Sequence, residues 1–406
     1  MKIAHISTFV SSGGAAIAAF RLHQSLMKHP DIESSMIQKY AEDRGFMQQN
    51  NIYLAEKDKS LIAKIERKLK IDKVTLQNKK LEELKGEYEI TSIPFSSYRL
   101  EDHPKIKEAD IIHLHWVADN FLNYPTFFKK TKQPIVWTLH DMNPFQGIFH
   151  YKDDEIQNRH ILGNIDKKYL KLKQDSINKK SNITIATPSA WLGNLSKNSD
   201  TFSGYNHVVI PYGMDFSLFS RLDRIEAKKK IGVNNSSKTI LFVSAGLDNP
   251  RKGIDLLLKA IDTLNEQNYN LISVGHGNID ICKKINYIHL GSISDSKKLN
   301  EVYSAADMTI LPSREDNLPN VMLESFANGT PVISFGNGGM AEHIKNGENG
   351  ILINEINPDA LATGINEFLE DKYYFNNDNI RKYAIDNFSD DRQTEKYIEL
   401  YNSLLK

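Results

Sequence analysis

The 406-residue sequence contains a single cysteine, Cys282, and its 51 basic side chains are balanced by 51 acidic ones. One cysteine cannot form a disulfide within the chain and leaves no thiolate cluster for zinc or iron–sulfur. This fits a reducing compartment. Because the charges cancel, the chain has no overall field suited to nucleic acid, and we predict no nucleic-acid partner.

Long apolar runs are also absent. No stretch of about 18 apolar residues occurs, so we predict no membrane-spanning helix. The first ten residues hold one lysine and a short apolar run without a small-residue cleavage pattern. They are better interpreted as a buried strand than as a signal peptide. We therefore expect a cytoplasmic protein, at most attached to the inner face of the cell membrane.

What the sequence does contain is an alternation of strand-like and helix-like segments. Twelve short, nearly all-apolar runs are typical of parallel strands covered on both faces. These runs are residues 2–7, 34–40, 109–117, 134–141, 182–189, 207–213, 239–245, 270–277, 286–291, 307–313, 331–336 and 350–354. Amphipathic segments between them predict helices, for example over 15–29, 253–267 and 296–306.

The length exceeds what one hydrophobic core usually organises. Strand–helix alternation predicts an α/β fold, and we expect two Rossmann-like, doubly wound domains facing a cleft. The natural boundary lies in residues 208–220, where a strand ends in Pro and Gly before a new helical pattern begins. The predicted domains are therefore residues 1–210 and 211–388.

Residues 307–339 carry the strongest candidate site. A strand is followed by a polar loop and then by a helix predicted from about Asn320 to Gly329. Backbone N–H groups and the positive end of the helix dipole converge there, which suits a phosphate. The carboxylates of Glu315, Asp316 and Glu324 crowd the same segment, and a carboxylate can accept hydrogen bonds from the vicinal hydroxyls of a sugar or ribose.

A second candidate segment is residues 244–261, a strand, a Gly-containing loop and a helix. Arg251 and Lys252 stand where that helix begins. Cations at this end oppose the helix dipole, so a bound anion between them would explain their presence.

In the N-terminal half, Gly13 and Gly14 lie between the first strand and the next helix, where a backbone without Cβ atoms can approach a ligand closely. The full Gly-x-Gly-x-x-Gly fingerprint is absent, which disfavours a nicotinamide oxidoreductase.

His140 ends another strand, and Asp141 could orient its ring. His115 and Trp116 end a third, where Trp116 either stacks on a sugar or is buried as core.

The acidic segment resembles the family-4 retaining glycosyltransferases, whose signature is two acids separated by seven residues. The matching pair is Asp316 and Glu324. The family usually has Glu first, so either Asp316 or Glu315 contacts the transferred sugar. The resemblance implies that Glu324 holds the ribose hydroxyls and that the backbone after the first acid binds the diphosphate. That backbone belongs to Asn317, Leu318, Pro319 and Asn320.

The same resemblance covers the basic segment. Lys252 matches a lysine that neutralises the donor diphosphate. The family also carries an arginine at the strand end, where this chain has Leu247, and Arg251 can substitute for it.

In the N-terminal half, Gly13 and Gly14 match a Gly-Gly-Ala loop beside the donor phosphates and the acceptor. Residues 134–151 resemble a subgroup that acts in surface-polysaccharide biosynthesis, in which the histidine matching His140 lies against the donor sugar. The implied architecture is the glycosyltransferase-B fold, in which residues 1–210 form the acceptor side and residues 211–388 bind the nucleotide-sugar donor. The last helix of this fold, here within 389–406, packs back on the N-terminal domain.

The implied reaction moves a hexosyl unit from a UDP- or GDP-sugar to a hydroxyl of a lipid-linked saccharide, in capsule, lipopolysaccharide or exopolysaccharide biosynthesis. Configuration is retained, and neither a metal nor a cofactor is expected. Two alternatives stay open: a nucleotide-sugar epimerase of the same fold, and a non-catalytic scaffold that binds a nucleotide sugar.

Residues 55–86 are predicted to be helical and basic, with ten Lys or Arg against six acids within 56–85, a net charge of +4. Leucines and isoleucines supply an apolar side. Such a segment can rest on anionic lipid, which predicts peripheral membrane contact. A solvated helical excursion is the alternative.

Overall fold

The computed structural model describes residues 1–264, 268–281 and 285–406. Contacts divide the chain into two compact units. The N-terminal unit comprises Met1–Ile210 and Gln393–Lys406, and the C-terminal unit comprises Pro211–Arg392. Cys282 and the last three residues of the helix predicted over 253–267 lie outside the described residues.

The N-terminal unit is built on a sheet of seven parallel strands in the order β3-β2-β1-β4-β5-β6-β7. The strands are β1 Lys2–Ile6, β2 Glu33–Gln38, β3 Ile52–Leu54, β4 Ile111–Leu114, β5 Ile135–Thr138, β6 Ile183–Thr187 and β7 Asn206–Val209. The direction of strand order reverses between β1 and β4. The carboxyl ends of the strands at such a reversal are where α/β sheets bind ligands.

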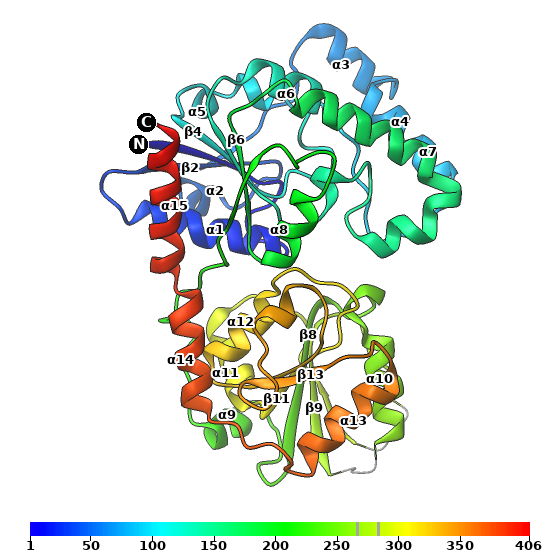
Figure 1. Cartoon of the computed structure of the whole chain (residues 1–406), viewed down its shortest axis with the longest axis vertical. Coiled ribbons are helices and arrows are strands. Elements are labelled where there is room, and N and C mark those ends of the chain that lie inside the picture. Colours follow the sequence, from blue (N-terminus) through cyan, green and yellow to red (C-terminus); the bar gives the residue numbers. More distant parts are fainter. Residues whose placement is uncertain (265–267, 282–284) are drawn as a thin grey trace. The chain divides into compact units, whose positions relative to one another are not determined.

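Helices connect these strands (Figure 1). They are α1 Gly14–Met27, α2 Arg44–Gln49, α3 Leu61–Lys68, α4 Lys73–Glu83, α5 Pro104–Lys107, α6 Tyr124–Lys130, α7 Lys152–Ile177 and α8 Ala190–Lys197, with the 3-10 turns η1 Leu100–Asp102 and η2 Asn143–Phe145. Several begin where the sequence offers a capping side chain. Asp43, Ser60 and Ser189 each accept a hydrogen bond from a backbone N–H in the first turn, which satisfies one of its unpaired donors.

The C-terminal unit holds six parallel strands in the order β10-β9-β8-β11-β12-β13. They are β8 Lys238–Gly246, β9 Tyr269–His276, β10 Asn286–His289, β11 Met308–Leu311, β12 Val332–Phe335 and β13 Gly350–Ile353. Its helices are α9 Arg224–Lys230, α10 Ile254–Thr263, α11 Ser296–Ala305, α12 Asn320–Ala327, α13 Pro358–Leu369 and α14 Asn377–Phe388, with η3 Pro250–Lys252 and η4 Gly338–Glu342.

Each unit has its own hydrophobic core, which is what makes it a domain. In the N-terminal unit, the fully buried Trp137 packs in a cluster with Ile112 and Phe202. In the C-terminal unit, Phe242 and Ile310 belong to a separate cluster. The prediction of two parallel, doubly wound α/β domains is confirmed.

The last helix, α15 Asp390–Leu404, belongs to the N-terminal unit from Gln393 onward. Tyr397 and Tyr401 are buried among side chains of β1, β4 and β5. The Tyr401 hydroxyl lies 2.6 Å from His113 Nδ1, and the Tyr397 hydroxyl lies 2.7 Å from Thr138 Oγ1. The final residues of the chain thus complete one face of a sheet that begins at its second residue.

No helix in the described part of the chain combines the length and the apolar character needed to cross a bilayer.

Candidate active site

The predicted acidic and basic segments of the C-terminal unit meet in space. The acidic loop follows β11 and the basic turn η3 follows β8, and these two strands are neighbours in the parallel sheet. Lys252 Nζ lies 2.5 Å from Asp316 Oδ2, and Arg251 Nη1 donates to the carbonyl oxygen of Glu315 at 2.9 Å. The structure therefore pairs the side chain of Asp316, rather than that of Glu315, with Lys252.

Asp316 is a half-buried carboxylate that stays ionised. Burial by itself would raise its pKa, but Lys252 and Arg251 outweigh that effect and hold the pKa below its usual value. Arg251 Nη1 lies 3.7 Å from Asp316 Oδ2, and the backbone N–H of Asn317 donates to Oδ1 at 3.0 Å. The basic turn predicted to bind an external anion thus already has an anionic partner within the chain.

Two glycines allow this close approach. Gly253 has a φ of +71°, and a Cβ atom there would lie 1.9 Å from the carbonyl oxygen of Pro312. Gly338 has a φ of +62°, and a Cβ atom there would lie 2.0 Å from the carbonyl oxygen of Asp316. At both positions, the backbone of a neighbouring segment occupies the space that a side chain would need.

A bidentate ion pair further fixes the acidic loop. Arg314 Nη1 and Nη2 donate to the two carboxylate oxygens of Asp255, in the first turn of α10, at 2.7 and 2.6 Å. The backbone N–H of Arg314 also donates to the carbonyl oxygen of Arg251 at 2.8 Å. This fork-shaped pairing holds the loop after β11 against the turn after β8.

Glu324 lies on α12 and is 6% exposed. The hydroxyl of Tyr303, from α11, donates to its Oε2 at 3.0 Å. Pro319 caps α12 without a side-chain hydrogen bond, and Asn320 is its first residue. Asn317 and Leu318 are buried.

Leu247 stands where the resemblance expects a strand-end arginine. It is 1% exposed and belongs to the apolar core of the C-terminal unit. Arg251 and Lys252 are both close to the acidic loop, and Arg251 contacts it through its guanidinium group.

In the N-terminal unit, Gly13 caps α1 with a φ of +87°, and Gly14 is the first residue of that helix. A Cβ atom on Gly13 would meet no atom within 4 Å. The backbone angle, rather than crowding, is therefore what favours glycine at Gly13.

His140 follows β5 and is half-buried. Its Nε2 lies 3.4 Å from His115 Nδ1, and His115 Nε2 lies 2.9 Å from His5 Nδ1. Burial lowers the pKa of His140 to about 4, although the charge of Asp141 acts in the opposite direction. The ring is therefore neutral at physiological pH.

The carboxylate of Asp141 organises the loop beyond His140. Its Oδ2 accepts hydrogen bonds from Trp116 Nε1 at 2.7 Å and from His150 Nδ1 at 2.6 Å, and its Oδ1 accepts one from the backbone N–H of Asn143 at 2.9 Å. We expected Asp141 to orient the ring of His140. Its hydrogen bonds instead fix Trp116, whose ring stacks on Phe9 at a centroid distance of 5.9 Å.

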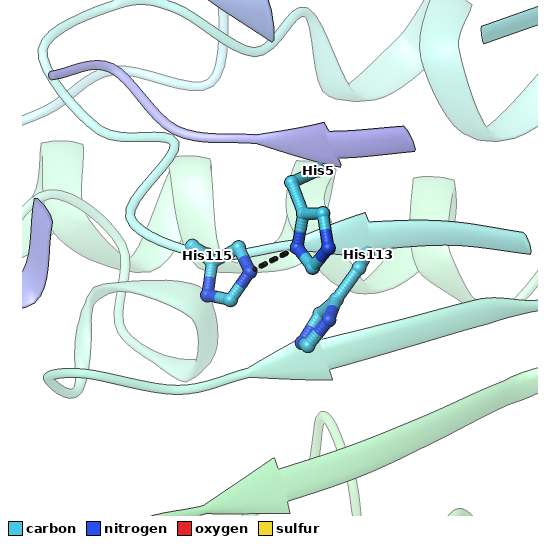
Figure 2. A group of neighbouring side chains, drawn as sticks. All are labelled: His5, His113 and His115. Atoms are coloured by element: carbon cyan, nitrogen blue, oxygen red, sulfur yellow. Dashed lines mark hydrogen bonds between the residues drawn. The ribbon is translucent and has the colours of Figure 1, made fainter. Parts of the chain in front are cut away.

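His5, His113 and His115 form a buried cluster in which one nitrogen from each ring lies within 4.8 Å of the others (Figure 2). Zinc would need such nitrogens to point at a common centre about 2.0–2.1 Å away. Instead, the rings of His113 and His115 overlap with centroids 4.0 Å apart, and His113 is hydrogen-bonded to Tyr401 and Thr138 through its two nitrogens. The cluster is a hydrogen-bonded network rather than a set of metal ligands.

Lys173, on α7, is a further residue that sequence reasoning missed. It is fully buried, and its Nζ donates to the carbonyl oxygen of Asn143 at 2.6 Å and to that of Gln146 at 3.0 Å. Burial lowers its pKa to about 7. Lys173 thus holds the turn that follows Asp141, and one lysine among many on a long helix gives no sequence signal of such a role.

Comparisons with known proteins show a likeness to glycosyltransferases. Residues 223–387 match the family model of glycosyl transferases group 1. An uncharacterized glycosyltransferase of Methanocaldococcus jannaschii is 34% identical over 202 residues, which are 46% of this chain and 50% of that protein. A D-inositol 3-phosphate glycosyltransferase of Mycolicibacterium gilvum is 29% identical over 39% of this chain and 38% of its own length. The matches thus span half or less of these relatives.

Solved structures resemble the whole chain. Sucrose-phosphate synthase of Thermosynechococcus elongatus superposes with a TM-score of 0.68 at 16% identity, over 99% of this chain and 98% of that one. Anabaena HepE in complex with UDP-glucose superposes with a TM-score of 0.68 at 17% identity, over 99% of this chain and 100% of that one.

These likenesses define a two-domain α/β protein of the glycosyltransferase-B fold. The match to the glycosyl transferases group 1 lies within its C-terminal unit.

Proposed function

We propose that this protein is a retaining glycosyltransferase that takes a hexosyl unit from a UDP- or GDP-sugar and transfers it to a hydroxyl of a saccharide. The observation that carries the proposal is the contact of Lys252 and Arg251 with the Asp316 loop, at the carboxyl ends of β8 and β11. The crystal structures of Anabaena HepE with UDP and with UDP-glucose support a nucleotide-sugar donor.

The donor diphosphate fits beside Lys252, where α12 begins. An ammonium group carries three N–H donors and can bridge a carboxylate and a phosphate. The N-terminus of α12 adds backbone N–H groups and the positive end of the helix dipole. Glu324 then accepts from the ribose hydroxyls, while Asp316 or Glu315 contacts the transferred sugar.

In the proposed reaction, the bond between the anomeric carbon and the diphosphate oxygen breaks. A bond from the acceptor hydroxyl oxygen forms on the same face of the sugar, and the hydroxyl proton passes to the departing phosphate oxygen. Lys252 and Arg251 stabilise the negative charge of the diphosphate as it leaves. His140 lies against the donor sugar, and the loop of Gly13 and Gly14 lies beside the donor phosphates and the acceptor. We expect turnover to be unaffected by a chelator such as EDTA.

We further propose that the acceptor is lipid-linked, as in capsule, lipopolysaccharide or exopolysaccharide biosynthesis, and that α3 docks on anionic lipid. Leu61, Ile62 and Leu69 are 73, 70 and 61% exposed, and with Ile65 they occupy one face at helical spacing. Lys64 and Lys68 flank this apolar face. Figure 1 shows α3 at the outer edge of the N-terminal unit. Exposed apolar side chains bordered by lysines are the chemistry that an anionic membrane surface binds.

Co-sedimentation with vesicles tests this docking. The wild-type protein should bind vesicles containing phosphatidylglycerol, bind phosphatidylcholine vesicles more weakly, and be released by salt. Leu61→Ser with Ile62→Ser should abolish binding. The control is Leu218→Ser with Ile225→Ser, two exposed apolar residues of the C-terminal unit. Equal binding by both double variants would refute a role for α3.

Thermal unfolding with UDP-, GDP- and ADP-sugars tests the donor site, because a ligand that binds the native state raises the melting temperature. We expect a shift with a UDP- or GDP-sugar, and no shift with any of them would end the proposal. Product analysis with the donor alone distinguishes an epimerase, which would change the sugar without an acceptor. A non-catalytic scaffold would bind the donor but would show no turnover with any acceptor.

A further inference from the structure

A row of three imidazoles runs from the loop after β5 into the N-terminal sheet. His140 is half-buried, whereas His115 is 2% exposed and His5 is fully buried. The outer contact joins His140 Nε2 to His115 Nδ1 at 3.4 Å, and the inner contact joins His115 Nε2 to His5 Nδ1 at 2.9 Å. The dashed line in Figure 2 marks the inner contact.

The three rings are neutral. Burial is the main cause that lowers the pKa of His5 and of His115 well below the usual value for histidine, and it lowers that of His140 to about 4. A neutral imidazole has one N–H donor and one acceptor nitrogen. Both contacts can therefore be hydrogen bonds only if the protons run in the same direction along the row.

Two directions are available. In the outward one, His5 Nδ1–H donates to His115 Nε2, His115 Nδ1–H donates to His140 Nε2, and His140 carries its own proton on Nδ1. In the inward one, His140 Nε2–H donates to His115 Nδ1, His115 Nε2–H donates to His5 Nδ1, and His5 carries its proton on Nε2.

The surroundings of His5 distinguish the two directions. His5 Nε2 is buried, and no protein group in the described ranges hydrogen-bonds to it. The inward direction would leave a buried N–H there without a protein acceptor, an arrangement that native proteins avoid. The outward direction leaves only an acceptor nitrogen at this position, so the protons run outward.

Other imidazoles packed against the inner rings have hydrogen-bond partners of their own. The nitrogens of His113 bind the Tyr401 hydroxyl and Thr138 Oγ1. Those of His23 bind Ser34 Oγ and the carbonyl oxygen of Asn50. The charge of Asp141 acts on His140 by favouring its protonated form, but burial outweighs it.

We propose that His115 and His5 are positioning residues that hold His140 as the neutral Nδ1–H tautomer, so that His140 meets a bound sugar with an N–H donor at Nδ1. The identity of the ligand rests on the proposed function, whereas the tautomer does not. His140 Nε2, whose lone pair accepts from His115, is thereby excluded as a general base.

Long-range ¹H–¹⁵N NMR spectra of the full-length, ¹⁵N-histidine-labelled protein test the tautomer directly, with His140→Gln used to assign the signals. We expect the proton of His140 on Nδ1 and a bare Nε2. A proton on His140 Nε2 would overturn the proposal. Because this spectrum needs no substrate, it reports the tautomer even if a variant at His115 fails to fold.

A matched pair of variants at His115 tests the positioning role. The side-chain amide of asparagine can place an N–H near the position of His115 Nδ1, so His115→Asn should preserve the His140 tautomer. Leucine has no N–H donor, so in His115→Leu the proton of His140 should no longer be confined to Nδ1. With UDP-glucose and UDP as calorimetric probes, His115→Leu should weaken UDP-glucose binding about tenfold and leave UDP binding unchanged, and His115→Asn should bind both normally. An unchanged His140 tautomer in His115→Leu would refute the positioning role.

His207→Gln controls for loss of a histidine elsewhere in the N-terminal unit, where His207 contacts Ser196 and Tyr205. This variant should behave as the wild type in both measurements. If the wild type shows the expected tautomer but binds neither UDP-glucose nor UDP, the proposed function fails, the sugar-binding part of the inference fails with it, and the tautomer assignment stands.

Discussion

Glu324 is a buried carboxylate whose charge can be removed with little change of shape. Its Oε2 accepts from the Tyr303 hydroxyl, and the amide oxygen of glutamine can accept in the same way. Glu324→Gln should therefore fold normally. Hydrogen bonds to a charged group contribute about 1.5–3 kcal/mol, so we expect UDP affinity to fall about 10- to 100-fold.

Calorimetric titration with UDP measures this effect. Glu348→Gln, which neutralises an exposed acid of the same unit, serves as the control and should bind UDP as tightly as the wild type. Wild-type affinity in Glu324→Gln would rule out contact of Glu324 with the ribose.

Gly253 and Gly232 allow two reasons for the presence of a glycine, a positive φ and steric crowding, to be measured separately. Both have a positive φ, of +71° and +75°, but only a Cβ atom on Gly253 would strike a neighbouring backbone. Gly232→Ala should lower the free energy of unfolding by about 1–2 kcal/mol, through the backbone angle alone. Gly253→Ala adds crowding against Pro312, which should cost about 1–3 kcal/mol more.

Chemical denaturation of the two alanine variants, followed by far-ultraviolet circular dichroism, measures the difference. Equal losses of stability would show that the loop after β11 can move away from residue 253, and that its contact with the basic turn is not rigid.

The sequence offered candidate residues that lie close together in the chain, but it did not reveal several contacts between distant residues. Asp316 and Glu324 follow from a spacing within one segment. His5 and His113, in contrast, become neighbours through the pairing register of β1 with β4, which the sequence does not reveal. The same holds for the Arg314–Asp255 ion pair, whose partners lie on different strand–helix connections.

At the scale of elements, each of the twelve apolar runs overlaps a strand. The strand that the sequence missed is β3, which has three residues, of which only Ile52 is buried. So short a strand at the edge of a sheet produces no apolar run, because little of it is covered. The parallel strands inside each sheet were predictable because helices cover both of their faces.

Helix α15 is joined to the N-terminal sheet by buried hydroxyl groups. The Tyr401 hydroxyl is the partner of His113 Nδ1, so Tyr401→Phe leaves a buried nitrogen without that partner. We expect the N-terminal unit to lose about 1–3 kcal/mol of its free energy of unfolding. Urea denaturation measures the loss, with Tyr374→Phe, 88% exposed, as the control. Equal stability of the two variants would contradict a structural role for this hydrogen bond.

At the scale of the whole molecule, histidines with lowered pKa values gather in the N-terminal unit. They include His5, His23, His113, His115 and His140, and burial is the leading cause for each of these five. For His23 and His140 the folded pKa is about 4, against 6.5 as the reference value. Below pH 6.5 the unfolded chain therefore binds protons that the folded unit does not, and stability falls as the pH falls from 6.5 towards 4.

Each such histidine should cost the N-terminal unit about 1.4 kcal/mol per pH unit over most of that window. Tryptophan fluorescence can follow this unit alone, because the three tryptophans, Trp116, Trp137 and Trp191, all lie within Met1–Ile210. Urea midpoints should fall steeply between pH 6.5 and pH 5. A midpoint independent of pH in this range would show that these rings are not buried in the neutral form.

The two ends of the chain share one unit, and this has a consequence for the order in which the protein can fold as it is synthesised. The C-terminal unit is continuous from Pro211 to Arg392, so all of it has been translated before Tyr397 and Tyr401 are added. Until then, the histidines of β4 and the apolar surface of β1 lack the helix that covers them. Domains usually fold from the N-terminus during translation. Of these two units, the one whose translation begins earlier is therefore completed later.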